Sequence, residues 1–379
     1  MANVDRRKFV GLAAMAPTLA WAQTPNNVGN KPALGTPRSV ITEPQRDFSP
    51  GVATSTPDPD IVRLDPAFGS LLIGQATIRR IATGFHFLEG PAWSSQGHYT
   101  VFSDVKMDVL YRHIWETGAV TTFRSPSFTT NGNTFDFQGR QISTQDFFRR
   151  LVRWEMDGSM TVLADKFDGK PLNSPNDVAP HKDGSVWFTD PKNGAALAEG
   201  HPDEGGLRNP AIGNSGVGIG LAGSMKQVLP ANVYRWDPSG RVDLVVPFET
   251  GLSANGICFS PDYTKIYLVR GGTLWVGDVA GQRIANLRQL TDNMIDGVRC
   301  GSDGMRCDIA GNIWSGASGP LGYAGVTVWN PEGKAIGRIR LPEPCANVCF
   351  AGPKRDWLFM AATSSVYLLR TNIQGASPG

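Results

Sequence analysis

Six polar residues recur along the chain, each just ahead of a short apolar run, and their side chains could bind a metal ion. They are Glu89, Asn131, Asn176, Asn255, Asp303 and Asn347, separated by 42, 45, 79, 48 and 44 residues. Carboxylate and amide oxygens are the donors that hard divalent cations prefer, and two carboxylates offset the charge of one such ion. The predicted metal ligands are Glu89, Asn131, Asn176 and Asp303.

A metal ion held in this way would polarise a carbonyl or phosphoryl oxygen of a substrate. Asp303 is the predicted general base, because a carboxylate beside the metal can accept a proton from attacking water. Asn131 and Asn255 are the predicted substrate contacts, and we interpret Asn347 as structural. Calcium is the first choice, with manganese, magnesium, zinc or iron(II) as substitutes. No histidine occupies any of the six positions, which disfavours a typical catalytic zinc site.

A simpler interpretation stays open for each position taken alone. Asn and Asp ahead of glycine are common turn residues, so any of them could merely shape a loop. Other catalytic arrangements have little support, because the five histidines are scattered and no G-x-S-x-G motif of a serine hydrolase is present. Recurrence in phase across a repeat favours the metal site.

The same spacing predicts the fold. A period of roughly 40 to 50 residues with several strands per unit is typical of a β-propeller. After each apolar inner strand come a tight turn, a second strand and an outer hairpin, as in residues 181–184 ahead of the strand at 186–190. We therefore predict an all-β, six-bladed propeller of four-stranded blades over residues 61–372. Residues 78–82 should add the outermost strand of the final blade and close the ring, which removes an exposed sheet edge.

The composition agrees with one large β domain and disfavours a basic binding surface. Charged residues make up 18% of the 379, and 44 glycines and 10 tryptophans suit many short strands. The net charge of +2 equals the contribution of Arg6, Arg7 and Lys8 less Asp5, so nucleic-acid binding is not expected. The five cysteines all lie in the last third, where an oxidising compartment would allow one disulfide. They are Cys258, Cys300, Cys307, Cys345 and Cys349, of which the first, third and fifth fall in inner strands as expected buried hydrophobes.

The N-terminus is read as a targeting segment followed by a linker. Residues 1–22 resemble a bacterial Tat signal, with twin arginines, a mildly apolar stretch and an Ala-Trp-Ala cleavage site. We expect export by the Tat machinery to a periplasmic or secreted location, without stable membrane insertion. Residues 23–60, with seven prolines up to position 59, are predicted to form a flexible linker.

The 79-residue interval contains a Gly- and Ala-rich insertion over residues 192–230. Loops of this length in a compact domain are usually functional or disordered, and we interpret this one as a lid over the channel mouth. Its Gly-Val-Gly-Ile-Gly run at 216–220 lacks the strand-then-helix context of a phosphate-binding loop.

Six motifs together resemble the gluconolactonase family, the calcium-dependent six-bladed propellers that include regucalcin-like (senescence marker protein) lactonases. They are the segments 88–93, 172–178, 187–191, 253–256, 303–308 and 347–350. The resemblance implies hydrolysis of a sugar lactone such as glucono-1,5-lactone to the aldonic acid. It also implies that Glu89, Asn176 and Asp303 are metal ligands and that Asn131 contacts substrate or metal, with Asn133 as a near neighbour.

Two departures from the family pattern concern the pocket wall. Where the family often has Glu-His after the second inner strand, this chain has Thr-Gln-Asp-Phe at 144–147, and where it often has Asp the chain has Arg270. Two other functions therefore stay open: a phosphotriesterase or other lactone hydrolase on the same metal ring, and a propeller that binds a ligand or protein without catalysis. A closed propeller can act as a monomer, so no partner protein is required.

Overall fold

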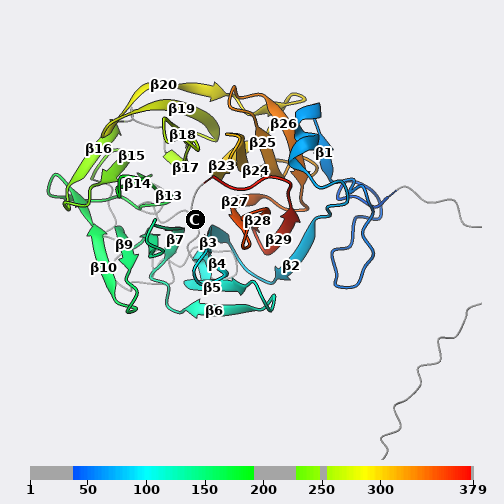
Figure 1. The fold of residues 1–379 in the computed structure, drawn as a ribbon, viewed down its shortest axis with the longest axis horizontal. Coiled ribbons are helices and arrows are strands. Elements are labelled where there is room, and N and C mark those ends of the chain that lie inside the picture. Colours follow the sequence, from blue (N-terminus) through cyan, green and yellow to red (C-terminus); the bar gives the residue numbers. More distant parts are fainter. Residues whose placement is uncertain (1–36, 192–227, 248–253, 377–379) are drawn as a thin grey trace, which may run out of the picture. The chain divides into compact units, whose positions relative to one another are not determined.

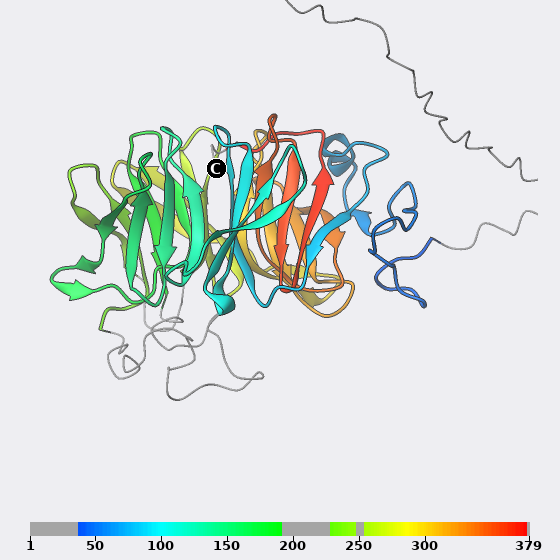
Figure 2. The same ribbon diagram turned by 90° about the horizontal axis from the view of Figure 1, so that it is seen from below.

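The computed structural model describes residues 37–191, 228–247 and 254–376. Six antiparallel sheets surround a central axis (Figure 1), and the strands of each sheet run along that axis when the molecule is seen from the side (Figure 2). The predicted all-β, six-bladed propeller is confirmed. Within the described part of the chain, no helix is long and apolar enough to cross a membrane.

The first three blades follow one another along the chain, each with its inner strand first. Blade 1 consists of β3 (Leu88–Ser94), β4 (Tyr99–Asp104), β5 (Val109–Ile114) and β6 (Val120–Arg124). Blade 2 consists of β7 (Thr130–Phe135), β8 (Gln141–Gln145), β9 (Arg150–Trp154) and β10 (Met160–Ala164). Blade 3 consists of β13 (Val178–Pro180), β14 (Val186–Asp190), β15 (Asn232–Trp236) and β16 (Val242–Pro247).

The last three blades include two strands from the N-terminal part of the chain. Blade 4 consists of β17 (Ala254–Phe259), β18 (Lys265–Arg270), β19 (Thr273–Ala280) and β20 (Arg283–Thr291). Blade 5 consists of β23 (Gly301–Cys307), β24 (Ile313–Ser318), β25 (Gly325–Trp329), β26 (Ala335–Arg340) and β1 (Ile61–Arg63). Blade 6 consists of β27 (Cys345–Ala351), β28 (Trp357–Ala362), β29 (Ser365–Arg370) and β2 (Arg79–Thr83).

Short elements connect strands within and between the blades. Two are hairpins, β11 (Lys166–Phe167) with β12 (Lys170–Pro171) and β21 (Met294–Ile295) with β22 (Val298–Arg299), and two are 3-10 helices, η1 (Pro66–Leu71) and η2 (Val105–Met107).

The ring closes through β2, as predicted for residues 78–82. This strand pairs antiparallel with β29, with Arg79 opposite Leu368 and Thr83 opposite Ser365. Because β2 comes from the start of the propeller and β29 from its end, the pairing covers the outer edge of β29 that would otherwise be open.

Blade 5 has a fifth strand that the sequence did not reveal. β1 pairs with β26 over three residues, from Ile61 opposite Ile339 to Arg63 opposite Gly337. The strand is too short to show an alternating pattern, and its partner lies more than 270 residues away in the chain. Such a pairing depends on contacts that only the folded propeller provides.

The part of the expected linker from Arg38 onward is folded rather than flexible. Arg46 Nη1 lies 2.6 Å from Asp58 Oδ1 and 3.3 Å from Asp60 Oδ2, and Arg46 Nη2 donates to the carbonyl oxygen of Ile78 at 2.8 Å. All three charged side chains are buried. The linker was expected because the segment has few large apolar residues, but ion pairs anchor it instead.

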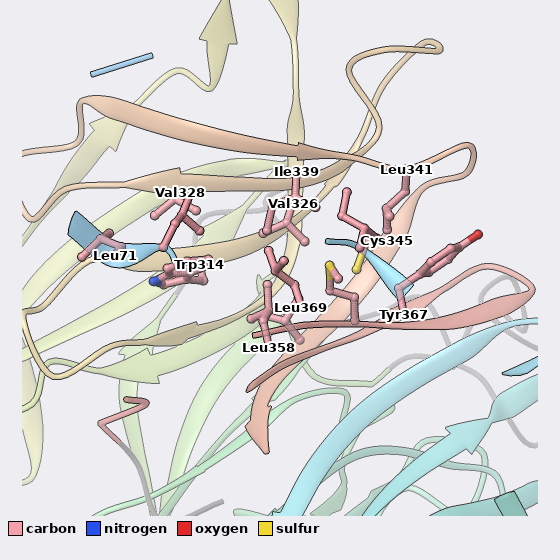
Figure 3. Packing of buried hydrophobic residues seen from close by; sticks show 14 of the residues in the cluster. Leu71, Trp314, Val326, Val328, Ile339, Leu341, Cys345, Leu358, Tyr367 and Leu369 are labelled. Atoms are coloured by element: carbon pink, nitrogen blue, oxygen red, sulfur yellow. The ribbon is translucent and has the colours of Figure 1, made fainter. Parts of the chain in front are cut away.

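Apolar side chains fill the space between neighbouring blades. In the cluster between blades 5 and 6, Val326 and Val328 of β25 pack with Leu358 and Leu369 of blade 6 (Figure 3). Residues two apart on a strand point to the same face, so each blade has an apolar face toward its neighbour. Phe68 and Leu71 of η1 join this cluster and thereby attach the N-terminal segment to the propeller.

All five cysteines are buried and free. Cys258, Cys307 and Cys349 lie in the inner strands β17, β23 and β27, as predicted. The Sγ atoms of Cys258 and Cys307 are 3.6 Å apart. The predicted signal at residues 1–22 and almost all of the predicted lid, residues 192–227, lie outside the described residues.

We expect the substitution Arg46→Met to lower the free energy of unfolding by about 3–5 kcal/mol, because it leaves two buried carboxylates without their cation. Urea denaturation of the mature protein measures this change. Arg241→Met is the matched control, because Arg241 pairs with Asp243 while half-exposed, and it should have little effect. Equal stability of the two variants would show that residues from Arg38 onward are not anchored in solution.

Candidate functional site

The six recurring polar residues all lie at one end of the inner strands. Five of them belong to β3, β7, β17, β23 and β27, and Asn176 stands two residues before β13. We call this set the ring residues: Glu89, Asn131, Asn176, Asn255, Asp303 and Asn347. The inner strands surround the axis (Figure 1), so the ring residues belong to the part of each blade that lies nearest the axis.

A β-bulge accompanies the ring residue in five of the inner strands. The register between first and second strands shifts between Glu89 and Ala92 in blade 1 and between Thr130 and Asn133 in blade 2. Equivalent shifts occur in blades 4, 5 and 6. A bulge places two residues opposite one and re-aims a side chain, which is a common device beside active sites.

Glycine follows four of the ring residues because the next inner strand passes very close. A Cβ atom at Gly90 would lie 2.1 Å from the carbonyl oxygen of Asn131, and one at Gly132 would lie 2.4 Å from that of Asn176. At Gly256 a Cβ would lie 2.2 Å from the carbonyl oxygen of Asp303. A Cβ atom at Gly304 would likewise come too close to the side chain of Asn347. Four of the six ring positions therefore lie directly against the next one around the axis.

Hydrogen bonds complete this circle. Asn347 Nδ2 donates to Glu89 Oε2 at 3.1 Å, which joins the last blade to the first. Gly132 N donates to the carbonyl oxygen of Asn176 at 2.8 Å. Between blades 3 and 4, Ile257 N donates to Asp177 Oδ2 at 3.4 Å. Asn347 is thus structural, as predicted, because its amide group positions the Glu89 carboxylate.

The ring residues differ in how far solvent and substrate can reach them. Glu89, Asn131 and Asn176 are only 1–3% exposed, whereas Asn255 and Asp303 are partly exposed. The buried Glu89 suits a structural metal ligand. The accessible Asp303 suits a group that exchanges protons with water, and Asn255 can reach a bound molecule.

The two carboxylates of the ring act on one cysteine. Burial, followed by the negative charges of Glu89 and Asp303, raises the pKa of the Cys345 thiol well above its usual range. Both carboxylates therefore lie near the same atom although they are more than 200 residues apart in the sequence. No group of three or more His, Cys, Asp or Glu side chains is placed to hold a metal ion within the described residues, so a metal here needs amide ligands as well.

Asn131 is available as such a ligand and Asn133 is not. Asn133 Nδ2 donates to Gly90 O at 2.9 Å and to Ser103 Oγ at 3.0 Å, and its Oδ1 accepts from Gln141 Nε2 and Ser143 Oγ. The Nδ2 atom of Asn131 is buried and has no hydrogen-bond partner among the described residues. The amide of Asn131 is therefore not fixed by the protein alone. An oxygen donor set of two carboxylates and the amides of Asn131 and Asn176 fits a hard divalent cation.

Two further carboxylates hold the loops that lead into ring positions. Asp104 accepts from the backbone N–H groups of His86 and Phe87 at 3.0 and 3.1 Å, just before Glu89. Asp190 accepts from Asn173 N and Ser174 N at 2.8 and 2.7 Å, just before the ring residue of blade 3. Burial raises the pKa of Asp190 to about 7.

Sequence reasoning did not identify Asp104 and Asp190 as positioning residues. A signal existed, because Phe-Ser-Asp at 102–104 and Phe-Thr-Asp at 188–190 occupy the same place at the ends of two second strands.

An ion pair lies below the ring inside the channel. Arg306 Nη1 is 3.6 Å from Asp177 Oδ2, and both side chains are almost fully buried. Burial raises the pKa of Asp177, and the Arg306 guanidinium opposes that rise. Beyond this pair the C-terminal segment runs toward the axis (Figure 1), where Ala376 N donates to the carbonyl oxygen of Cys307 at 3.0 Å. The C-terminal segment therefore lies at the opposite end of the inner strands from the ring residues.

Known proteins resemble this chain over most of its length. Residues 87–364 match the family described as SMP-30/Gluconolactonase/LRE-like region. Over 399 aligned residues the chain is 26% identical to a gluconolactonase of Zymomonas mobilis subsp. mobilis, with 98% of this chain and 99% of the relative covered.

Solved structures extend the likeness to three dimensions. A gluconolactonase from Xanthomonas campestris has a TM-score of 0.68 at 25% identity, covering 86% of this chain and 99% of its own. A calcium-binding regucalcin from Agrobacterium tumefaciens shares the fold, with a TM-score of 0.61 at 18% identity, covering 79% of this chain and 95% of its own.

Because the chain passes so close to Gly132, we expect Gly132→Ala to disturb the site. The added methyl group would lie 2.4 Å from a backbone oxygen, so the inner strands of blades 2 and 3 must separate. We expect a loss of about 1–3 kcal/mol in the free energy of unfolding, measured by urea denaturation, together with weaker metal binding measured by calorimetry. Gly74→Ala is the control, since nothing lies within 4 Å of that position. Wild-type stability and metal affinity in Gly132→Ala would contradict the tight ring.

Proposed function

Because the chain belongs to the SMP-30/Gluconolactonase/LRE-like family, we propose that it is a metal-dependent lactonase acting on lactones of the glucono-1,5-lactone type. One observation supports this most directly: Glu89 and Asp303, from opposite halves of the chain, lie near the starts of the inner strands β3 and β23, and Asn131 has the same place on β7. A gluconolactonase relative that covers almost the full chain supports the same reaction class.

In this proposal Glu89, Asn131, Asn176 and Asp303 hold a divalent cation, with calcium preferred because all the donors are oxygens. When bound, such a cation supplies Lewis-acid polarisation of the lactone carbonyl. Asn347 keeps the Glu89 carboxylate in place through its 3.1 Å hydrogen bond. Asn131 and Asn255 orient the lactone by hydrogen bonds.

Asp303 acts as general base because it is the partly exposed carboxylate of the ring. It accepts a proton from a water molecule, whose oxygen adds to the lactone carbonyl carbon. The bond between that carbon and the ring oxygen then breaks, and the ring oxygen takes up the proton. The products are a carboxylate and a new hydroxyl group on one open chain, together with one released proton.

Export to the periplasm by a Tat signal remains part of the proposal. Its support is the twin-arginine segment at residues 1–22, which lies outside the described residues. A lid formed by the insertion at 192–230 is likewise proposed from its length and composition alone.

We expect chelator-treated mature protein to have no turnover of glucono-1,5-lactone above spontaneous hydrolysis, and added calcium or a substitute cation to restore it. Proton release in weak buffer measures the rate. In calorimetry, Glu89→Gln should weaken metal binding by about tenfold or more, whereas Glu116→Gln, at an exposed site, should not. Unaltered affinity in Glu89→Gln would exclude Glu89 as a ligand.

For Asp303→Asn we expect kcat to fall by about 10²- to 10⁴-fold, because the amide cannot accept the proton. Metal affinity should fall less than in Glu89→Gln, since Asp303 is partly exposed whereas Glu89 is buried. Steady-state kinetics at saturating metal distinguish the two effects. Asp157→Asn, in an exposed hairpin turn, is the matched control. Retention of wild-type kcat in Asp303→Asn would remove this residue as the base.

A further inference from the structure

A cluster of aromatic rings lies at the ring end of blade 2. Phe128 precedes β7, Phe147 and Phe148 follow β8, and Arg150 begins β9. The ring centroid of Phe148 lies 5.7 Å from that of Phe128 and 5.7 Å from that of Phe147. The Arg150 guanidinium lies 5.1 Å from the Phe148 ring and 5.7 Å from the Phe128 ring. We call these four residues the aromatic rim.

The aromatic rim borders the candidate site between two ring positions. Phe147 N donates to Thr129 Oγ1 at 3.1 Å, two residues before the ring residue of blade 2. Arg149 Nε donates to the carbonyl oxygen of Leu172, four residues before the ring residue of blade 3. The loop carrying Phe147 and Phe148 is therefore hydrogen-bonded to the segments that lead into both positions.

The backbone that holds the rings is tightly constrained. Asp108 Oδ1 accepts from Ser127 N at 3.1 Å, from Ser127 Oγ at 2.8 Å and from Thr129 N at 2.6 Å. Phe128, Thr129 and Arg149 have φ angles of 62°, 51° and 57°. Residues other than glycine rarely adopt this left-handed region of φ. Such a backbone conformation persists where surrounding contacts hold it in place. The rings thus have a fixed place at the mouth of the site.

The aromatic rim offers apolar surface while its polar neighbours are already engaged. Phe148 is 36% exposed and Phe128 is partly exposed. Gln145 Oε1 accepts from Arg150 Nε at 2.5 Å. Asp146 is buried and accepts from Phe147 N, and burial raises its pKa to about 7. Gln145 is uncharged and Asp146 is buried, so neither side chain presents an exposed carboxylate to the hydroxyl groups of a bound molecule.

We propose that the aromatic rim is a subsite for an apolar substituent, so that the preferred substrate is a 1,5-lactone bearing an alkyl or aryl group. This inference rests on the proposed lactonase function and narrows its substrate class. Apolar surface placed against the rings leaves water favourably. Hydroxyl groups placed there would lose hydrogen bonds to water without replacement.

The test compares two lactones with the metal-loaded protein. Kinetics are measured with glucono-1,5-lactone and with δ-decanolactone, a 1,5-lactone that has a pentyl chain. We expect wild-type kcat/KM to favour δ-decanolactone. Phe148→Ala should lower the ratio of kcat/KM for δ-decanolactone to kcat/KM for glucono-1,5-lactone by about tenfold. Most of this change should come from a higher KM for δ-decanolactone.

Phe128→Ala provides a second variant with the same expected direction. Phe137→Ala is the matched control, because Phe137 is 51% exposed and lies beyond the opposite end of β7. It should leave the ratio unchanged. Calorimetric titration with 5-hydroxydecanoate, the product of δ-decanolactone hydrolysis, gives a readout without turnover, and Phe148→Ala should weaken this binding by about tenfold as well.

The outcomes distinguish the inference from the proposed function. If the ratio is unchanged in both variants, including the case of an equal loss for the two lactones, the subsite is overturned and the lactonase function is not. Preference of the wild type for glucono-1,5-lactone also overturns it. Hydrolysis of neither lactone by the metal-loaded wild type overturns the proposed function and the subsite together.

Discussion

The site depends on how closely the six inner strands approach one another at one end of the channel. At Gly90, Gly132 and Gly256, a Cβ atom would come within 2.1–2.4 Å of a backbone oxygen on the next strand. Only glycine allows that approach, and the approach brings six side chains to one axis. The β-bulges follow from the same requirement, because a regular strand would point these side chains into a neighbouring blade.

Burial gives chemically similar ring residues different roles. Glu89 is buried and held by Asn347, so its carboxylate is oriented before any ligand arrives. Asp303 is partly exposed and can exchange a proton with water. Behind the ring, Asp104 and Asp190 hold the loops that lead into positions 1 and 3. Such supporting contacts determine whether ligand groups stand at the right distance.

The proposed chemistry and the proposed selectivity lie on different parts of the blades. The ring residues lie on or next to the inner strands, which are fixed by packing between blades. The aromatic rim lies on the loops beside them, where residue types can change without disturbing the sheets. This division explains how one propeller can keep a reaction centre while its substrate changes.

The sequence by itself determined the architecture and the members of the ring. The polar residues recur every 42–48 residues, apart from one interval of 79 residues that contains an insertion. This recurrence was enough to predict six blades and the closing strand near residues 78–82. This worked because each blade is a local unit whose turns and strands are specified within a short segment. The residues at equivalent places in those units must then converge.

Only the tertiary structure decided the contacts between units. It engaged the amide of Asn133 fully between blades 1 and 2 and left the Nδ2 atom of Asn131 without a partner among the described residues. It also paired Arg306 with Asp177 and anchored the N-terminal segment through Arg46. The residues in these contacts lie 12 to more than 100 positions apart in the sequence. Neither composition nor periodicity indicates such partners. They depend on where the closed ring places each side chain in space.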